Sequence, residues 1–300
     1  MESYSKRVKS ELLRIMPEKE HCRIAEAAGL FYMAGSVIYE EETIASIDLE
    51  KGLLKKYFTL LKKTNIVCSY GVGQKEIRGE EADEFLSLIG YDRDRPGRLP
   101  EEILSRDCCR KSFLRGAFLA SGSVTDPDKG YHLEITARGE EEAHGIITVM
   151  ASFLCDGKII LRQERPVVYL KESGKIADML TAMGASAAML DLENTKVRKE
   201  INNTINRKVN CETANIGKMV DAAVREINDI KLIEEKIGLD NISPRLAETA
   251  RLRLSHPDLP LQELGKMHEP PVGKSGVNHR LRRICKMASD IRDQEEFKRS

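Results

Sequence analysis

Ala28-Gly-Leu-Phe-Tyr-Met-Ala-Gly-Ser-Val37 has a close copy later in this 300-residue chain, Arg115-Gly-Ala-Phe-Leu-Ala-Ser-Gly-Ser-Val124. The two stretches align at one offset of 87 residues. The identical pairs are Gly29/Gly116, Phe31/Phe118, Gly35/Gly122, Ser36/Ser123 and Val37/Val124. An internal repeat of this kind indicates a structural unit that is present twice.

The segments that follow the two copies also share a pattern of apolar periodicity and β-branched runs. After the first copy, the pattern predicts a strand, a helix, a strand and a closing helix, at Thr43–Leu49, Gly52–Lys63, Ile66–Tyr70 and Glu81–Ile89. After the second, it predicts a strand, a helix, two strands and a closing helix, at Tyr131–Thr136, Glu140–Leu154, Lys158–Arg162, Val167–Leu170 and Gly174–Met183. The fold class is therefore α+β, with two halves of the αββαββα type.

The glycines of the repeat suggest how the halves meet. A helix that contains two glycines loses about 1 kcal/mol for each relative to alanine. That loss is tolerable where a missing side chain lets two helix backbones approach closely. We therefore expect the two glycine-containing helices to pack face to face as a pseudo-twofold pair.

The paired segments resemble the central helices of LAGLIDADG homing endonucleases. In that family, an acid just before the last glycine of each helix holds a divalent metal for DNA cleavage. Ala34 and Ser121 stand at these positions, and neither offers the carboxylate that a hard cation prefers. We therefore expect no catalytic residues, no metal and no cofactor. The carboxylates Asp92, Asp94, Asp126 and Asp128 stand in turn-forming sequences, so turn chemistry explains them.

The sequence is divided into four parts. We predict an N-terminal helical segment at residues 1–20 and the repeat domain at 21–190, with halves at about 22–90 and 108–185. A linker follows at 191–212, and a helical domain at 213–300. The linker is rich in Asn, Lys and Arg, yet apolar residues recur at every fourth position from Val197 to Val209, so part of it is predicted to be a narrow helix. The helical stretch after it is predicted at Ala214–Glu235.

The end of the chain has the layout of a helix-turn-helix, at about residues 259–290. Ser243-Pro244 is a favourable helix start for Pro244–Leu254. A second helix is predicted at Leu261–Met267, and the break Glu269–Gly273 separates it from a last helix at Ser275–Ala288.

The last helix divides into an apolar and a basic face. Val277, Leu281, Ile284 and Ala288 share one side and are expected to face the core. The predicted DNA-binding residues are Lys274, Ser275, Asn278, His279, Arg280, Arg282, Arg283 and Lys286. Asn and Arg can read base edges, whereas Lys274 and Arg280 are predicted to contact phosphates. His279 has no partner at metal-ligand spacing and is predicted to be a groove contact or a plain surface residue. The alternative is a solvent-exposed cationic face on an ordinary bundle helix.

Four motifs together resemble the WhiA family along essentially the whole chain: residues 113–124, 130–135, 206–215 and 275–283. The resemblance implies a degenerate LAGLIDADG-like domain joined to a helix-turn-helix. It also implies a role in sporulation control, or in cell division and chromosome segregation.

Charge and composition limit the other function classes. The net charge is zero, with 27 basic and 31 acidic residues in 1–191 against 21 and 17 in 192–300. The positive charge is concentrated in Lys274–Lys286, which suits double-stranded DNA.

No signal peptide or membrane span is evident, so a cytoplasmic, nucleoid-associated location is expected. No small-molecule substrate is indicated.

The seven cysteines form no C-x-x-C pair, and Cys108-Cys109 has no second pair at zinc-site spacing. They are interpreted as reduced, mostly buried thiols.

The leading hypothesis is a sequence-specific DNA-binding regulator without nuclease activity, for which another regulatory protein is a further candidate partner. One alternative is a nucleoid-associated or protein-interaction factor in cell division. The other is a divalent-metal-dependent endonuclease that uses a carboxylate such as Asp126.

Overall fold

The computed structural model describes residues 2–64 and 75–297, and its contacts divide the chain into two compact units, residues 1–200 and 201–300. The predicted strand Ile66–Tyr70 lies outside the described residues. Among the residues described, no helix is both long and apolar enough to span a membrane.

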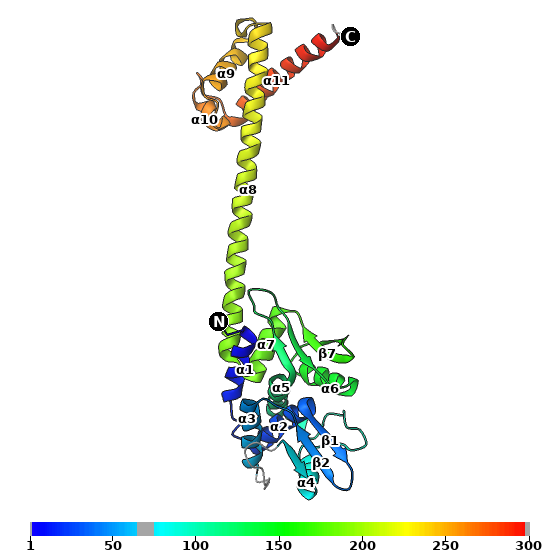
Figure 1. The fold of residues 1–300 in the computed structure, drawn as a ribbon. Coiled ribbons are helices and arrows are strands. Elements are labelled where there is room, and N and C mark those ends of the chain that lie inside the picture. Colours follow the sequence, from blue (N-terminus) through cyan, green and yellow to red (C-terminus); the bar gives the residue numbers. More distant parts are fainter. Residues whose placement is uncertain (1, 65–74, 298–300) are drawn as a thin grey trace. The chain divides into compact units, whose positions relative to one another are not determined.

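Two helices, α2 (Glu20–Ala34) and α5 (Asp107–Ser121), lie against each other at the centre of the first unit (Figure 1). A Cβ atom at Gly29 would stand 2.2 Å from the backbone oxygen of Phe113, and one at Gly116 would stand 2.3 Å from that of Glu26. The backbones therefore touch where the side chains are missing. This confirms the predicted face-to-face packing of the repeated helices.

The second glycine of each copy is not helical, contrary to our prediction. Helix α2 ends at Ala34 and Gly35 begins strand β1 (Gly35–Tyr39), while α5 ends at Ser121 and Gly122 begins β4 (Gly122–Val124). A Cβ at Gly35 would be 2.4 Å from the ring of Phe31, and one at Gly122 would be 2.3 Å from the ring of Phe118. The glycine is needed because the phenylalanine folds back over the point where helix becomes strand.

Each half carries an antiparallel sheet beside the helix pair. The first has the order β1-β2-β3, with β2 at Thr43–Ile47 and β3 at Glu76–Arg78. The second has the order β4-β5-β7-β6, with β5 at Leu133–Thr136, β6 at Lys158–Arg162 and β7 at Arg165–Leu170. Val37 pairs with Ala45 in the first sheet, and Ile135 with Val168 in the second. Alternate residues of β2 and β5 are buried, so one face of each sheet packs on the core.

The remaining helices of the first unit cover this core. They are α1 (Tyr4–Arg14), α3 (Lys51–Lys62), α4 (Glu80–Leu88), a short 3₁₀ helix (Ile103–Ser105), α6 (Glu140–Ala151) and α7 (Ser173–Met183). Helix α1 begins at a Ser3 cap, whose hydroxyl accepts a hydrogen bond from the Lys6 amide at 3.3 Å. Its apolar stripe Tyr4, Val8 and Leu12 is buried.

The predicted linker is not a separate element. One 51-residue helix, α8 (Ser186–Lys236), runs through residues 191–212, and the boundary between the two units falls inside it. The narrow helix that the sequence predicts for part of this segment extends through all of it, because Asn and Thr cost at most about 0.7 kcal/mol each in a helix, unlike proline. Residues 186–236 contain no proline and a single glycine, Gly217.

The second unit packs three shorter helices against the end of α8. They are α9 (Pro244–Ser255), α10 (Leu261–Lys266) and α11 (Lys274–Phe297), with a 3₁₀ turn at Leu239–Asn241. Helix α11 continues past the predicted end at Ala288, because residues 289–297 contain no proline or glycine and include the good helix formers Arg, Gln and Glu, although they show no apolar period.

Candidate nucleic-acid interface

The apolar face of α11 holds the helix in the second unit. Val277, Leu281, Ile284 and Ala288 are each at most 1% exposed. They pack with buried residues of α8, α9 and α10, including Ile230, Leu246 and Leu264. The predicted core face of the last helix is therefore confirmed.

The turn that joins α10 to α11 is tightly held. The Val272 amide donates to the Gly265 carbonyl at 2.9 Å, and a Cβ at Gly265 would lie 2.1 Å from the Val272 oxygen. His268, 1% exposed, lies between α9 and α10, with Nε2 2.9 Å from the Thr249 hydroxyl and Nδ1 3.0 Å from the Leu264 oxygen. These contacts fix the direction in which α11 leaves the turn.

The opposite face of α11 is polar and open. Its exposed residues are Lys274, Ser275, His279, Arg282, Arg283 and Lys286, with Asn278 half-buried beside them. Within residues 2–64 and 75–297, Arg282, Arg283 and Lys286 form no ion pair with an acid. Their positive charges are therefore available to a polyanion.

Arg280 differs from the other basic residues of the helix. Its Nη1 lies 3.3 Å from the Thr249 hydroxyl and 3.6 Å from the Glu248 carboxylate, and its side chain is 19% exposed. It thus ties α11 to α9. Its predicted phosphate contact stays a prediction, and that contact would compete with Glu248.

The C-terminal ends of α2 and α5 correspond to the place where the LAGLIDADG endonucleases, which the repeat resembles, hold metal. Ala34 and Ser121 are the last residues of the two helices, and the Ser121 hydroxyl donates to the Ala117 oxygen at 3.4 Å. The guanidinium of Arg138 donates to the Gly35 oxygen. The positively charged side chain of Arg138 therefore lies at Gly35, next to Ala34, where a nuclease of that family needs a carboxylate.

The carboxylates weighed as alternative metal ligands form turns. Asp92 Oδ1 accepts the Asp94 amide at 3.0 Å, and Asp126 Oδ1 accepts the Asp128 amide at 2.9 Å. Asp128 also pairs with Arg198 at 2.7 Å. Turn chemistry thus accounts for these acids, as the sequence predicted.

The thiols are arranged differently from what the sequence suggested. Cys22, Cys109 and Cys155 are buried as expected, but Cys211 is exposed. The fold also brings Cys22 next to Cys108-Cys109, together with His21. Sequence spacing missed this group because its members come from two helices far apart in the chain.

Comparison with known proteins agrees with both units. The model of the WhiA C-terminal HTH domain matches residues 205–288, and that of the WhiA LAGLIDADG-like domain matches residues 110–202. A "Probable cell division protein WhiA" of Lachnoclostridium phytofermentans is 40% identical over 311 residues, covering 97% of this chain and 99% of the relative. The chain belongs to the WhiA family. A relative of the same name from Clostridium acetobutylicum is also 40% identical, over 97% and 99% of the two chains.

Full-length DUF199/WhiA from Thermatoga maritima has the same fold. Its crystal structure matches with a TM-score of 0.60 at 25% identity, covering 96% of this chain and 99% of that one. This WhiA family member therefore combines a LAGLIDADG-like domain with a C-terminal helix-turn-helix domain. The match to the WhiA C-terminal HTH domain begins at residue 205, which lies inside the predicted linker 191–212. That start agrees with the structure, in which α8 runs through this segment without a break.

Proposed function

We propose that this protein is a sequence-specific regulator that binds double-stranded DNA through α11 and does not cleave it. The open basic face of α11 is the observation that carries the proposal. Arg282, Arg283 and Lys286 project from a helix whose other side is fully anchored in the core. An anchored helix can hold its side chains in a major groove at a defined register.

The residues of this face have different proposed roles. Asn278 and Arg282 are proposed to read base edges, since amide and guanidinium groups can bond adenine and guanine bidentately. Lys274 and Arg280 are proposed to contact phosphates, which position the helix. Ser275, His279, Arg283 and Lys286 complete the proposed DNA surface.

The cellular role is proposed from the relatives, which are named probable cell division proteins. Regulation of cell division and chromosome segregation, or of sporulation, by a nucleoid-associated cytoplasmic protein agrees with a helix-turn-helix domain. A second regulatory protein is a further proposed partner.

The proposal is tested by measuring how a triple variant of the protein binds DNA. Arg282→Ala, Arg283→Ala and Lys286→Ala together should abolish selection of specific sites from a random DNA pool and strongly reduce affinity. A charge-matched control changes three exposed lysines of α8, Lys208, Lys218 and Lys231, to alanine and should retain site selection. Unchanged affinity and salt dependence in the α11 variant would show that this face does not bind DNA.

The absence of nuclease activity is proposed from Ala34, Ser121 and the Arg138–Gly35 hydrogen bond. Supercoiled plasmid incubated with the protein and Mg²⁺ should stay intact. Nicking that is lost in Asp126→Asn would support the endonuclease alternative instead.

Genome-wide mapping of binding sites distinguishes a regulator from the remaining alternative, a nucleoid-associated factor. Sharp promoter sites indicate a regulator, and broad coverage indicates a nucleoid factor.

A further inference from the structure

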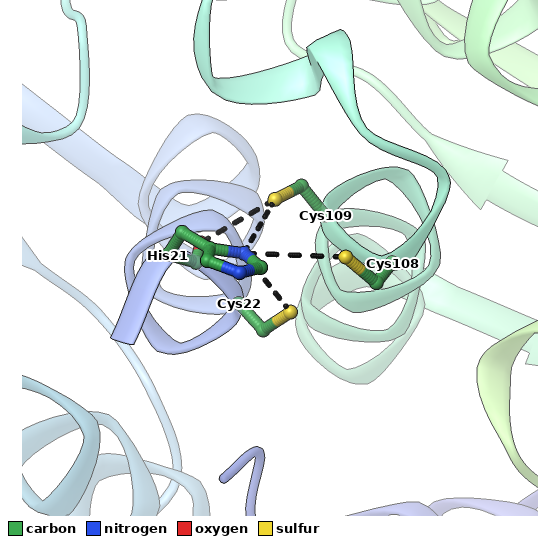
Figure 2. Close-up of side chains that lie close together, drawn as sticks. All are labelled: His21, Cys22, Cys108 and Cys109. Atoms are coloured by element: carbon green, nitrogen blue, oxygen red, sulfur yellow. Dashed lines mark hydrogen bonds between the residues drawn. The ribbon is translucent and has the colours of Figure 1, made fainter. Parts of the chain in front are cut away.

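Four side chains with metal-binding chemistry meet where α2 and α5 begin. His21 and Cys22 lie in the first turn of α2, and Cys108 and Cys109 lie in the first turn of α5. Figure 2 shows the three sulfur atoms arranged around the His21 ring. This is the end of the helix pair away from Ala34 and Ser121.

The distances suit a single small ion. His21 Nδ1 lies 3.1 Å from the sulfur of Cys109, 3.3 Å from that of Cys22 and 4.0 Å from that of Cys108. The four potential ligand atoms all lie within 4.8 Å of one another. In a tetrahedral zinc site, Zn–S bonds of about 2.3 Å and Zn–N bonds of about 2.0 Å place neighbouring ligand atoms about 3.5–3.8 Å apart.

The ligands obey the internal symmetry of the fold. Cys22 and Cys109 lie 87 positions apart, as do His21 and Cys108, which is the offset that relates Gly29 to Gly116. The two residues before them also correspond, as Lys19-Glu20 and Arg106-Asp107. Each half of the repeat therefore supplies two ligands from equivalent positions, on either side of the pseudo-twofold axis.

We propose that His21, Cys22, Cys108 and Cys109 form a Cys₃His site for one Zn²⁺ ion, which joins the two halves of the LAGLIDADG-like domain. Thiolate and imidazole are the ligands that zinc prefers. Four protein ligands fill a tetrahedral shell, so the site is structural, with no open position for a substrate. A four-iron cluster would need its ligands spread around a larger core.

The surroundings favour thiolates once an ion is present. The ligands stand at the N-termini of two helices, where the helix dipoles favour negative charge. The exposed cations Lys19 and Arg106 flank them, and burial together with these two cations lowers the pKa of His21. Burial favours the protonated form of the Cys109 thiol by raising its pKa. Zinc would displace such protons as it binds.

Metal analysis of the full-length protein tests the proposal. Protein prepared without chelators should contain one zinc per chain, and chelator treatment should lower its melting temperature. Cobalt-substituted protein should show the strong visible bands of a tetrahedral ion and a thiolate-to-cobalt charge-transfer band. Cys108→Ser and His21→Gln, both at partly exposed positions, should lose zinc, whereas the control Cys211→Ser should keep it.

Folding of the variants is checked by circular dichroism, so that loss of metal can be distinguished from loss of structure. Three outcomes overturn the proposal. The first is unchanged zinc content in the Cys22→Ser, Cys108→Ser double variant. The second is protein with reduced thiols that stays metal-free when zinc is added. The third is iron rather than zinc at the site.

Discussion

Glu26 of α2 and Arg115 of α5 form a buried ion pair, with Oε2 2.8 Å from Nη2, directly beside the contact between Gly29 and Gly116. The other carboxylate oxygen of Glu26 lies 2.7 Å from Nζ of Lys56 on α3. Arg115 also donates to the Met183 oxygen at 2.9 Å, and Lys56 donates to the Leu12 oxygen at 2.9 Å. The Glu26 carboxylate thus links the two halves of the domain. It also anchors Lys56, which bonds to the end of α1, and Arg115, which bonds to the end of α7.

Glu26→Ala should destabilise the first unit by about 3–5 kcal/mol, because it leaves two buried cations without their counter-charge. Urea unfolding followed by tyrosine fluorescence measures this effect, since all eight tyrosines lie in residues 1–200 and the chain has no tryptophan. The exposed neighbour Glu20 provides the control, and Glu20→Ala should change stability little. Equal effects of the two substitutions would contradict the role of Glu26.

Gly29→Ala should destabilise the same unit by about 1–3 kcal/mol, as overpacking does. The added Cβ would meet a backbone oxygen, that of Phe113, which can move only if the helices separate. Gly130→Ala is the matched control, since no atom lies within 4 Å of its added Cβ. A Gly29→Ala variant as stable as the control would show that the helices can separate at no cost.

Gly265→Ala should disturb the turn before α11, because its Cβ would collide with the Val272 oxygen. An effect of about 1–3 kcal/mol on the second unit is expected. Hydrogen exchange measured by mass spectrometry should show faster exchange in residues 259–290, together with weaker DNA binding. Gly217→Ala on α8, where the added Cβ has open space, should leave both unchanged.

Lys286→Ala should weaken binding to all DNA sequences by a similar factor and reduce the slope of log affinity against log salt by about 1. Arg282→Ala should instead cost about 1–3 kcal/mol at the preferred site and relax preference at one base pair. Titrations over a range of salt concentrations, with specific and random DNA, distinguish the two. A sequence-selective effect of Lys286→Ala would refute its role as a charge contact.

Glu142→Gln should stabilise the first unit near neutral pH. Burial raises the pKa of Glu142 above its ordinary value of 4.5, against the opposing effects of backbone hydrogen bonds and Arg138. The folded protein therefore holds this proton more tightly than the unfolded chain does. The resulting stability is fully present below pH 4.5 and is lost as pH rises through the folded pKa.

The amide variant should escape this loss, so its advantage over the wild type should grow from pH 4 to pH 7 in urea unfolding. The exposed Glu140→Gln serves as the control. A constant difference between variant and wild type across this range would show that Glu142 does not titrate as inferred.

Local patterns determined much of this structure. The repeat at residues 28–37 and 115–124 predicted a close helix pair, and a backbone contact at Gly29 and Gly116 follows from side chains that are absent. The period of Val277, Leu281, Ile284 and Ala288 predicted which face of α11 is buried. Such features depend on residues within one turn or one element, so the sequence shows them directly.

Tertiary structure alone decided the rest. Gly35 and Gly122 begin strands because a phenylalanine ring packs over them, and Arg280 is held by α9 across the unit. His21-Cys22 and Cys108-Cys109 meet only because α2 and α5 pack in parallel. Neither dipeptide has ligand spacing on its own, and the offset of 87 residues that pairs them acquires chemical meaning only once the helices touch.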